Sequence, residues 1–150
     1  MTAKCNLIID SCCDLPLDMV QREGVYLVEF PFLFDTEQHL DDFGASMPAK
    51  EFYDRMRKGN FPTTSQISIP AYTEVFERAA QSGIPTVYLS FSSALSGSYN
   101  VSLLVRDQLQ EKYPEMQLYI VDTKLASVAE GALVYEALRQ RDAGLTAEEL

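Results

Sequence analysis

Short apolar runs alternate with amphipathic helical patterns along most of this chain, and this alternation restricts its fold more than any other feature. The apolar runs are typical of buried strands and span residues 5–9, 86–91 and 118–121. The helical patterns place apolar residues on one face and span about 70–82, 100–112 and 125–142. A chain that alternates such strands and helices is predicted to form an α/β fold with a mainly parallel sheet flanked by helices.

The segment after the first helical region is less regular. Residues 26–34 favour a strand, but Glu29 and Pro31 interrupt the pattern, which predicts an irregular or edge strand. The polar residues 35–43 predict a small hairpin or a polar excursion. His39 is the chain's only histidine and is expected to be an exposed residue of that hairpin.

Two shorter helices are indicated by proline and glycine at their ends. Pro16 is well placed to begin a helix that runs to about Glu23, where Gly24 stops it. Pro48 begins another helix, which ends at Gly59 and carries apolar residues four apart on one face. Both helices are therefore expected to be short.

Composition excludes several classes of function. The chain has 150 residues, of which 47% are hydrophobic, and this is enough for one domain with a core. Its formal net charge of −10 repels phosphate backbones and anionic lipid surfaces, so nucleic-acid binding is not expected. No apolar stretch reaches membrane-spanning length, so integral membrane association is not expected. Three cysteines without a signal peptide favour a reducing, cytoplasmic location.

A turn rich in hydroxyl groups joins the second apolar run to the helix that follows. Residues 92–99 carry four serines and a glycine where a strand ends and a helix begins. Free backbone N–H groups and the helix dipole favour an anion at such a turn. A second hydroxyl cluster, residues 63–66, lies in a loop upstream. If the two loops meet, they form a donor-rich pocket for a carboxylate or a phosphate.

Polar residues follow each of the three predicted parallel strands. Asp10 and Ser11 come after the first strand, residues 92–98 after the second, and Asp122 with Thr123 after the third. Ligands of parallel α/β sheets bind beyond the carboxyl ends of the strands. These three segments are therefore predicted to converge on a binding site.

Other readings of these residues remain open. A serine hydrolase would need a base beside its nucleophile, and Ser96 lacks both a nearby histidine in sequence and the glycine two places before it. Asp10, Asp14 and Asp122 can gather around Mg²⁺, or they can cap turns and helices. Ser96 can simply cap the following helix by accepting a hydrogen bond from the N–H of Tyr99. No glycine-rich phosphate loop is present, so nucleotide binding is unsupported.

Five segments, in order along nearly the whole chain, resemble motifs of the DegV family. The family's motifs are D-S-x-x-D-L-P, E-F-Y-x-x-M, P-x-T-S-Q, S-S-x-L-S-G-T-Y and D-S-x-x-x-S-x-x-x-G. The matching segments are Asp10–Pro16, Glu51–Met56, Pro62–Gln66, Ser92–Tyr99 and Asp122–Gly131.

The resemblance implies a two-domain α/β protein that binds a long-chain fatty acid such as palmitate or oleate. In the family, hydroxyl groups at the positions of Thr64 and Ser96 hold the carboxylate. The supporting loop positions are Asp10, Ser11, Ser65, Ser93, Gly97 and Ser98. Some members carry the fatty acid to a separate fatty acid kinase, so the resemblance implies a lipid-binding protein with a kinase partner. It implies no catalytic residue, metal or cofactor in this chain.

The resemblance also suggests how the chain is divided. Residues 1–145 are expected to form the first domain, and residues 146–150 to begin a helix that leads to a second domain. Thr146 and Glu149 have the spacing of a capping box, which opens a helix. The alternative function is a regulatory or interaction domain that binds a small anion, with a serine hydrolase as the third reading.

Three positions depart from the family's pattern. Ile67 stands where the family usually has proline, and Ser98 replaces a threonine. Glu130 stands where the pattern more often has a glycine, and near a carboxylate site it is expected to oppose the ligand. Four phenylalanines are candidates for lining an acyl tail or, alternatively, for the ordinary core, and they are Phe30, Phe32, Phe34 and Phe91.

Overall fold

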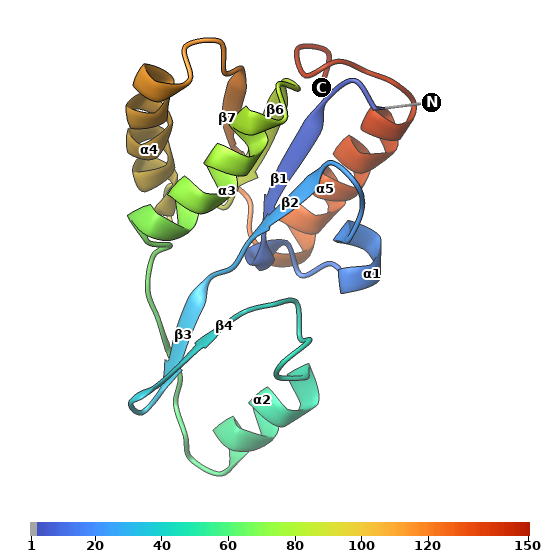
Figure 1. The fold of residues 1–150 in the computed structure, drawn as a ribbon. Coiled ribbons are helices and arrows are strands. Elements are labelled where there is room, and N and C mark those ends of the chain that lie inside the picture. The colour runs from blue at the N-terminus through green and yellow to red at the C-terminus, as the bar shows by residue number, and fades with distance from the viewer. Residues whose placement is uncertain (1–2) are drawn as a thin grey trace.

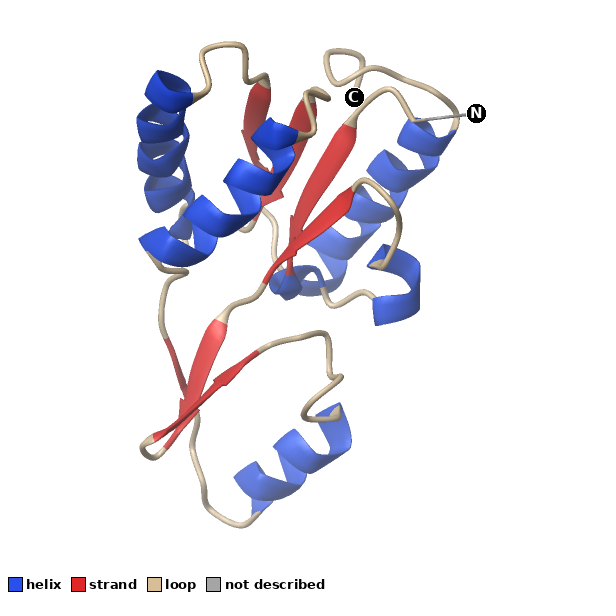
Figure 2. Ribbon diagram, in the orientation of Figure 1, coloured by secondary structure: helices blue, strands red, loops and turns tan. Residues whose placement is uncertain are grey.

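The centre of the protein is a four-stranded parallel sheet in the order β2-β1-β6-β7. The computed structural model describes residues 3–150. The strands are β1 (Asn6–Asp10), β2 (Val25–Val28), β6 (Thr86–Ser90) and β7 (Leu118–Asp122). Figures 1 and 2 show helices on both faces of this sheet. The predicted fold class is therefore confirmed.

Successive side chains of the strands enter two separate cores, because a strand alternates its faces. On one face, Ile8 and Tyr88 pack with α3 (Ile69–Gln81) and α4 (Ser98–Lys112). On the other, Leu7 and Leu89 pack with α5 (Ser127–Asp142) and the short helix α1 (Leu17–Val20). Both faces of the sheet are thus covered by helices, and only its edges and the ends of its strands remain uncovered.

A smaller antiparallel unit lies beyond the carboxyl ends of the parallel strands (Figure 1). It comprises β3 (Pro31–Phe34), β4 (Glu37–Leu40), α2 (Ala49–Arg57) and β5 (Thr63–Thr64), with strand order β4-β3-β5. We call residues 31–64 the small lobe and the rest of the described chain the body. The lobe has its own core, formed by Phe32, Phe34 and Met47 with the partly buried Phe52 and Met56.

The interruption predicted within residues 26–34 marks the boundary between body and small lobe. The chain leaves the edge strand β2 after Val28 and enters β3 at Pro31. Proline has no N–H to donate, so the first position of a strand suits it. The hairpin predicted for residues 35–43 also forms, as β3 and β4 pair in antiparallel register.

His39 is not the exposed hairpin residue that the sequence suggested. Its register partner across the hairpin is Phe32, and the two rings stack with centroids 5.1 Å apart. The exposed fraction of its side chain is only 17%, and Nε2 lies 3.2 Å from a carboxylate oxygen of Glu37. Cross-strand packing against an aromatic ring therefore covers it.

The helix that begins after Pro16 is shorter than predicted: it ends at Val20 instead of near Glu23. Beyond the helix, the buried Arg141 holds the chain near Glu23. Its guanidinium donates hydrogen bonds to the carbonyl oxygens of Cys5, at 2.9 Å, and Glu23, at 2.6 Å. These bonds hold the chain in position to enter β2.

Thr146 and Glu149 form part of the predicted capping box. The Glu149 carboxylate accepts the Thr146 N–H at 2.8 Å, while the Glu149 N–H bonds to the Thr146 carbonyl oxygen and not to its hydroxyl.

No helix within residues 3–150 is long and apolar enough to cross a membrane.

Candidate functional site

A cavity of about 1190 Å³ lies between the small lobe and the carboxyl ends of the parallel strands. This is slightly larger than the range of about 300–1,000 Å³ typical of small-molecule sites. Its walls come from both parts of the molecule: the loops after β1 and β6 from the body, and β3, α2 and the loop after β4 from the small lobe. The cavity therefore occupies the edge where an α/β sheet usually binds its ligand.

The two hydroxyl loops meet along one wall of this cavity. Thr64, Ser65 and Gln66 line it from the β5–α3 connection, and Ser96 and Gly97 line it from the turn before α4. The sequence predicts a donor-rich pocket if these two loops meet, and in the structure they do meet.

Ser98 joins the two loops from behind the wall. Its buried hydroxyl accepts the Ile67 N–H at 3.0 Å and pairs with the Ser96 hydroxyl at 2.9 Å. Gly97 packs directly against Gln66. A Cβ at position 97 would therefore overlap the oxygen of the Gln66 side chain. Both contacts keep the hydroxyl loops at a fixed separation.

Donors on this wall are free to serve a ligand. Among residues 3–150, neither the exposed Thr64 hydroxyl nor the Gly97 N–H makes a hydrogen bond. Ser96 does not cap α4 through Tyr99, contrary to the simpler expectation. Its Oγ instead accepts the N–H of Ser98 at 3.1 Å, in a local turn. The wall can therefore offer hydroxyl and amide hydrogens to an anion at the amino end of α4.

The remaining wall is largely apolar. Phe30, Phe32 and Phe91 line the cavity, whereas Phe34 packs in the core of the small lobe. Phe30 and Phe91 meet edge to face, with centroids 5.6 Å apart. Three of the four phenylalanines proposed from sequence thus reach the cavity.

The small lobe contributes cavity residues that sequence reasoning missed. They are Leu40, Phe43, Met47, Phe52 and Tyr53. Helix α2 has no fully buried residue: Phe52 packs against the lobe's core on one side and, with Tyr53, lines the cavity on the other. The four-residue spacing of Phe52 and Met56 was visible in the sequence, but an amphipathic helix is normally read as facing a core.

Acidic residues line the side of the cavity opposite the hydroxyl wall. Asp41 and Asp42 follow β4, and Asp14 follows the short 3₁₀ turn Ser11–Cys13. The strands β4 and β5 flank β3 on opposite sides. Asp41, which follows β4, and Thr64, in β5, therefore lie on opposite sides of β3. The cavity therefore has a donor side and an acidic side.

Three supporting residues expected at the site lie outside the cavity, and so do Asp122 and Thr123, which were predicted to converge on it. Ser93 binds Asp122 through its N–H, at 3.0 Å, and through its hydroxyl. Ser98 is buried as described above. Asp10 is fully buried, and its carboxylate accepts hydrogen bonds from Cys12 N at 3.1 Å, Phe91 N at 2.8 Å and the Tyr88 hydroxyl at 3.2 Å. Their hydrogen bonds organise the loops that reach the cavity.

Ser11 does line the cavity, and it connects the body to the small lobe. Its hydroxyl oxygen accepts the Phe30 N–H at 3.0 Å. Burial raises the pKa of the neighbouring Asp41, although a hydrogen bond from Ser11 opposes that shift. The acidic side is therefore tied to the turn after β1.

Glu130 does not face the cavity, contrary to the expectation that it would oppose a ligand. It lies in the first turn of α5, is 0% exposed, and sits beside Asp10. Burial, together with the charge of Asp10, raises the pKa of Glu130 well above its ordinary range. The side chain of Asp10 also has a raised pKa because of its burial. Burial therefore favours the neutral form of Glu130, and the side chain lies outside the cavity.

The other chemistries considered from sequence find separate explanations for their residues. Asp14 accepts the Ser127 hydroxyl, and Asp122 accepts the N–H groups of Ser93 and Lys124. Residues 3–150 contain no cluster of acidic, cysteine or histidine side chains that could hold a metal ion. The Ser96 hydroxyl bonds to Ser98, while His39 stacks inside the small lobe.

Cys12 lines the cavity, but it is a poor nucleophile. Burial and the nearby carboxylates of Asp10 and Glu130 raise the pKa of its thiol far above the ordinary value. A thiol that keeps its proton reacts slowly, because the thiolate is the reactive form.

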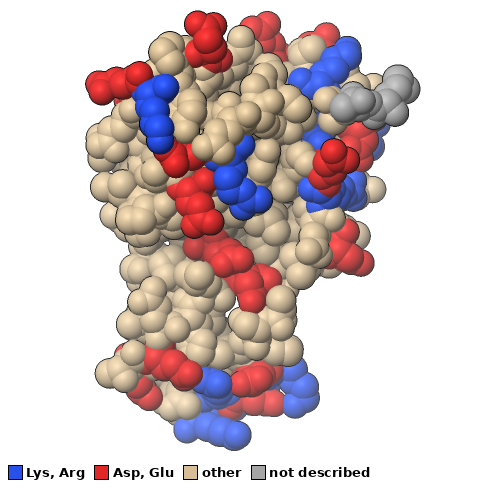
Figure 3. Space-filling model, in the orientation of Figure 1, with Lys and Arg blue, Asp and Glu red and all other residues tan. Residues whose placement is uncertain are grey.

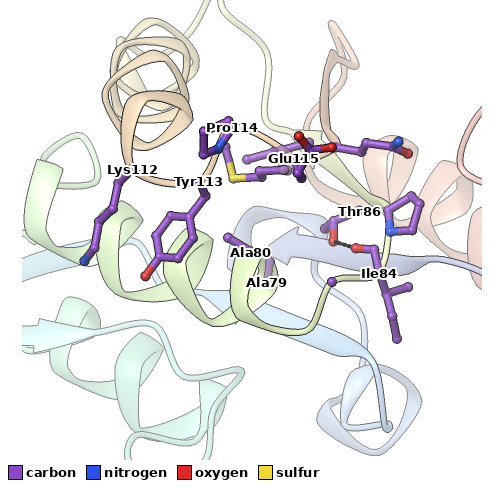
Figure 4. Close-up of a pocket in the computed structure, with 13 residues that line it drawn as sticks. Ala79, Ala80, Ile84, Thr86, Lys112, Tyr113, Pro114 and Glu115 are labelled. Atoms are coloured by element: carbon purple, nitrogen blue, oxygen red, sulfur yellow. Dashed lines mark hydrogen bonds between the residues drawn. The ribbon is translucent and has the colours of Figure 1, made fainter.

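A second cavity, of about 360 Å³, lies at the opposite, amino edge of the sheet. Figure 4 shows Ala79 and Ala80 from α3, Thr86 from β6, and Lys112 with Tyr113 at the end of α4. The Thr86 hydroxyl donates a hydrogen bond to the Ile84 carbonyl oxygen at 3.0 Å, and the Lys112 ammonium pairs with Glu77. The Thr86 hydroxyl and the Lys112 ammonium are therefore already paired within the protein.

Charge is unevenly spread over the surface. Figure 3 shows charged side chains at the two ends of this face, whereas the waist between body and small lobe is mostly uncharged and is crossed by one acidic strip. The cavity lies between the body and the small lobe, at this waist.

Comparison with known proteins gives consistent matches. Residues 4–150 match the family model described as an uncharacterised protein of the DegV family. A DegV domain-containing protein of Clostridium perfringens is 38% identical over 144 residues, which are 96% of this chain and 50% of that protein. The chain spans about half the length of the relatives it matches.

Solved structures show the same fold. A stearic acid-binding protein from Eubacterium ventriosum superimposes with a TM-score of 0.85 at 29% identity, over 98% of this chain and 50% of that one. A DegV family protein from Thermus thermophilus, described with its fatty acid binding, has a TM-score of 0.81 at 27% identity. That match covers 97% of this chain and 50% of the other.

Proposed function

The chain belongs to the DegV family, and on that premise we propose that it binds a long-chain fatty acid in the cavity between the body and the small lobe. The observation that carries the proposal is the composition of this one cavity, which joins a wall of hydroxyl donors to a wall of aromatic and aliphatic side chains. The similar proteins described as binding stearic acid and fatty acid support it.

The proposed ligand has one orientation. Its carboxylate lies against Thr64 and Ser96, with Ser65, Gly97 and Gln66 around it, and its acyl chain extends over Phe32 toward α2. The acidic residues Asp41 and Asp42 disfavour the reverse orientation, because like charges repel across a short distance. Phe52 and Tyr53 of α2 form the surface that the acyl chain would cover.

The two ends of the ligand have different roles. Burial contributes about 0.8 kcal/mol per CH₂, so a long acyl chain supplies on the order of 10 kcal/mol before the costs of ordering. A hydrogen bond to the charged carboxylate adds only about 1.5–3 kcal/mol. The acyl chain therefore sets the affinity, while the hydroxyl groups set the position of the carboxylate.

The proposal extends to presentation of the carboxylate to a partner fatty acid kinase. The exposure of Thr64 supports this, since the carboxylate would lie near the surface and not deep inside the body. Because the chain covers half of its relatives, we also propose that a second domain covers the open side of the cavity. Hydroxyl donors hold an anion less tightly than a bidentate arginine, which suits a group that is handed on.

Lipid extraction with mass spectrometry, followed by titration with palmitate and oleate, tests the binding. The double variant Thr64→Ala/Ser96→Ala should bind fatty acid about a hundredfold more weakly or worse, since it loses two donors to a charged group, each contributing about 1.5–3 kcal/mol. Thr63→Ala is the matched control, because Thr63 is also exposed but does not line the cavity. A wild-type protein that takes up no fatty acid, or that prefers inorganic phosphate, would refute the proposal in favour of a small-anion site.

A further inference from the structure

Two tyrosine hydroxyl groups are buried in the apolar core of the body, and the binding proposal gives them no role. Tyr72 of α3 and Tyr88 of β6 are both 0% exposed and pack among apolar side chains such as Ile8, Val75 and Phe76. Neither tyrosine lines the cavity. Burying a hydroxyl group costs free energy unless it is hydrogen-bonded, and phenylalanine would fill nearly the same space without that cost. Packing alone therefore does not account for the two hydroxyl groups.

The two hydroxyl groups form a hydrogen-bonded network that ends at Asp10. The Tyr88 hydroxyl donates to Oδ2 of Asp10 at 3.2 Å, and the oxygens of Tyr72 and Tyr88 lie 2.9 Å apart. A phenol has a single O–H, so Tyr88, which donates to Asp10, accepts its second hydrogen bond from Tyr72. Oδ2 of Asp10 also accepts the Phe91 N–H at 2.8 Å, and Oδ1 accepts the Cys12 N–H at 3.1 Å. We call these three side chains the Tyr72–Tyr88–Asp10 network.

The network joins three elements, and each of them is continuous with a segment that lines the cavity. After β1 comes the turn that carries Ser11 and Cys12, and after β6 comes Phe91, which leads to Ser96. The hydroxyl loop of residues 64–66 comes shortly before α3. The Tyr72–Tyr88–Asp10 network therefore connects three parts of the cavity wall from inside the body.

We infer that Tyr72 and Tyr88 are positioning residues for the ligand's carboxylate: their hydroxyl groups fix Asp10, which in turn fixes the backbone on two sides of the cavity. The inference rests on the proposed function, because it concerns the same site. Without the Tyr88 hydroxyl, the Asp10 carboxylate loses one of its three donors, and the turn that leads from Phe91 to Ser96 is held less firmly. Because neither hydroxyl group borders the cavity, the network acts on the donor wall and leaves the contacts of the acyl chain unchanged.

The test compares palmitate with hexadecanol, an alcohol of the same chain length that carries no charge. Tyr88→Phe removes a donor from Asp10 and keeps the aromatic ring in the core. It should lower palmitate affinity about fivefold, which corresponds to one hydrogen bond, and leave hexadecanol affinity unchanged. Tyr72→Phe removes only the hydrogen bond to Tyr88, one step further from Asp10, and should lower palmitate affinity by less.

Phe76→Leu is the matched control, because Phe76 packs against both tyrosine rings and has no polar group. It should lower the free energy of unfolding and keep the wild-type ratio of palmitate affinity to hexadecanol affinity. A wild-type ratio in Tyr88→Phe would overturn the inference, and so would an equal change of this ratio in Phe76→Leu. If Tyr88→Phe fails to fold, the same ratio measured for Tyr72→Phe decides the question.

A ligand-free measurement separates this inference from the proposed function. In the unliganded protein, Tyr88→Phe should speed hydrogen exchange of the Phe91 amide more than that of the amides within β1, because it weakens the hold of Asp10 on Phe91. In Phe76→Leu the two sets of amides should speed up together. If palmitate does not bind at all, the proposed function fails, while this exchange still decides the role of Tyr88. Equal acceleration at both places in Tyr88→Phe contradicts the positioning role.

Discussion

The body and the small lobe are stabilised in different ways, and the binding site lies where they meet. The body has two cores on opposite faces of a sheet whose central strands, β1 and β6, are entirely buried. The small lobe has one core of three buried side chains, and its helix α2 has none. The body therefore provides a rigid wall of donors, while the lobe provides an apolar wall that can adjust to an acyl chain.

The largest expected effect comes from opening the body's core. Phe76 is 0% exposed and packs against Tyr72 and Tyr88. Phe76→Ala should lower the free energy of unfolding by about 3–5 kcal/mol, because it removes a buried ring and leaves a cavity. Urea denaturation followed by circular dichroism measures this loss.

Phe34→Ala makes the matching change in the small lobe. Phe34 is also buried, at 3% exposure, but its neighbours are the few side chains of the lobe's core. Amide hydrogen exchange should show lost protection in residues 31–64 and retained protection in β1 and β6. Equal loss of protection in both parts would show that the two form one cooperative unit.

The contrast also explains what the sequence could reveal. The body was predictable because its buried strands and amphipathic helices have strong periodic patterns, and because hydroxyl residues follow strands whose carboxyl ends share an edge. The small lobe was only partly predictable. Phe52 and Tyr53 on α2 look like core residues, and nothing in their spacing tells that they face a cavity.

Long-range contacts were equally hidden from sequence. Ser98 joins α4 to Ile67, which lies 31 residues earlier. Glu130 meets Asp10 only because α5 packs on the turn after β1. Sequence spacing cannot reveal such pairs. For this reason Glu130 is expected from sequence to oppose the ligand, whereas in the structure it is buried outside the cavity.

The next largest effect is expected at the contact between the two hydroxyl loops. Ser98→Ala leaves the Ile67 N–H without its buried acceptor, which should cost about 1–3 kcal/mol of stability. The same change frees Ser96 from its partner, so palmitate affinity should fall as well. Chemical denaturation and isothermal titration measure the two losses.

Thr63→Ala is the matched control, because Thr63 is exposed and lies outside the cavity. The comparison between rigid wall and adaptable wall would fail if Ser98→Ala lost stability but bound palmitate as the wild type does.

Stability should also depend on pH through the buried acids of the body. Burial raises the pKa of Glu130 above its ordinary value of 4.5, and that of Asp10 above 3.8. The folded protein therefore holds protons that the unfolded chain releases, so this stability is complete at acidic pH and is lost as pH rises. The slope is about 1.4 kcal/mol per pH unit for each such proton.

Thermal or urea unfolding from acidic to alkaline pH measures this slope. Glu130→Gln should flatten it above neutral pH, whereas Glu136→Gln on the exposed side of α5 should leave it unchanged. A wild-type protein whose stability rises from neutral to alkaline pH would contradict the assignment of a proton to the buried pair.

The smallest expected effect lies on the surface of the small lobe. Arg55 on α2 pairs with Glu37 on β4 at 3.2 Å and with Glu51 at 3.0 Å, and its guanidinium lies over the Phe34 ring. Exposed ion pairs contribute little, so Arg55→Ala should lower the stability of the lobe by less than about 1 kcal/mol. Hydrogen exchange in residues 31–64 detects the change, and added salt should reduce the difference from wild type.

Lys50→Ala is the control for this change. It removes an exposed pair within α2 alone, and so it should leave the contact between α2 and the hairpin intact. If Arg55→Ala and Lys50→Ala weaken the lobe equally, the helix is held to the hairpin by Phe34 and Phe52 and not by charge.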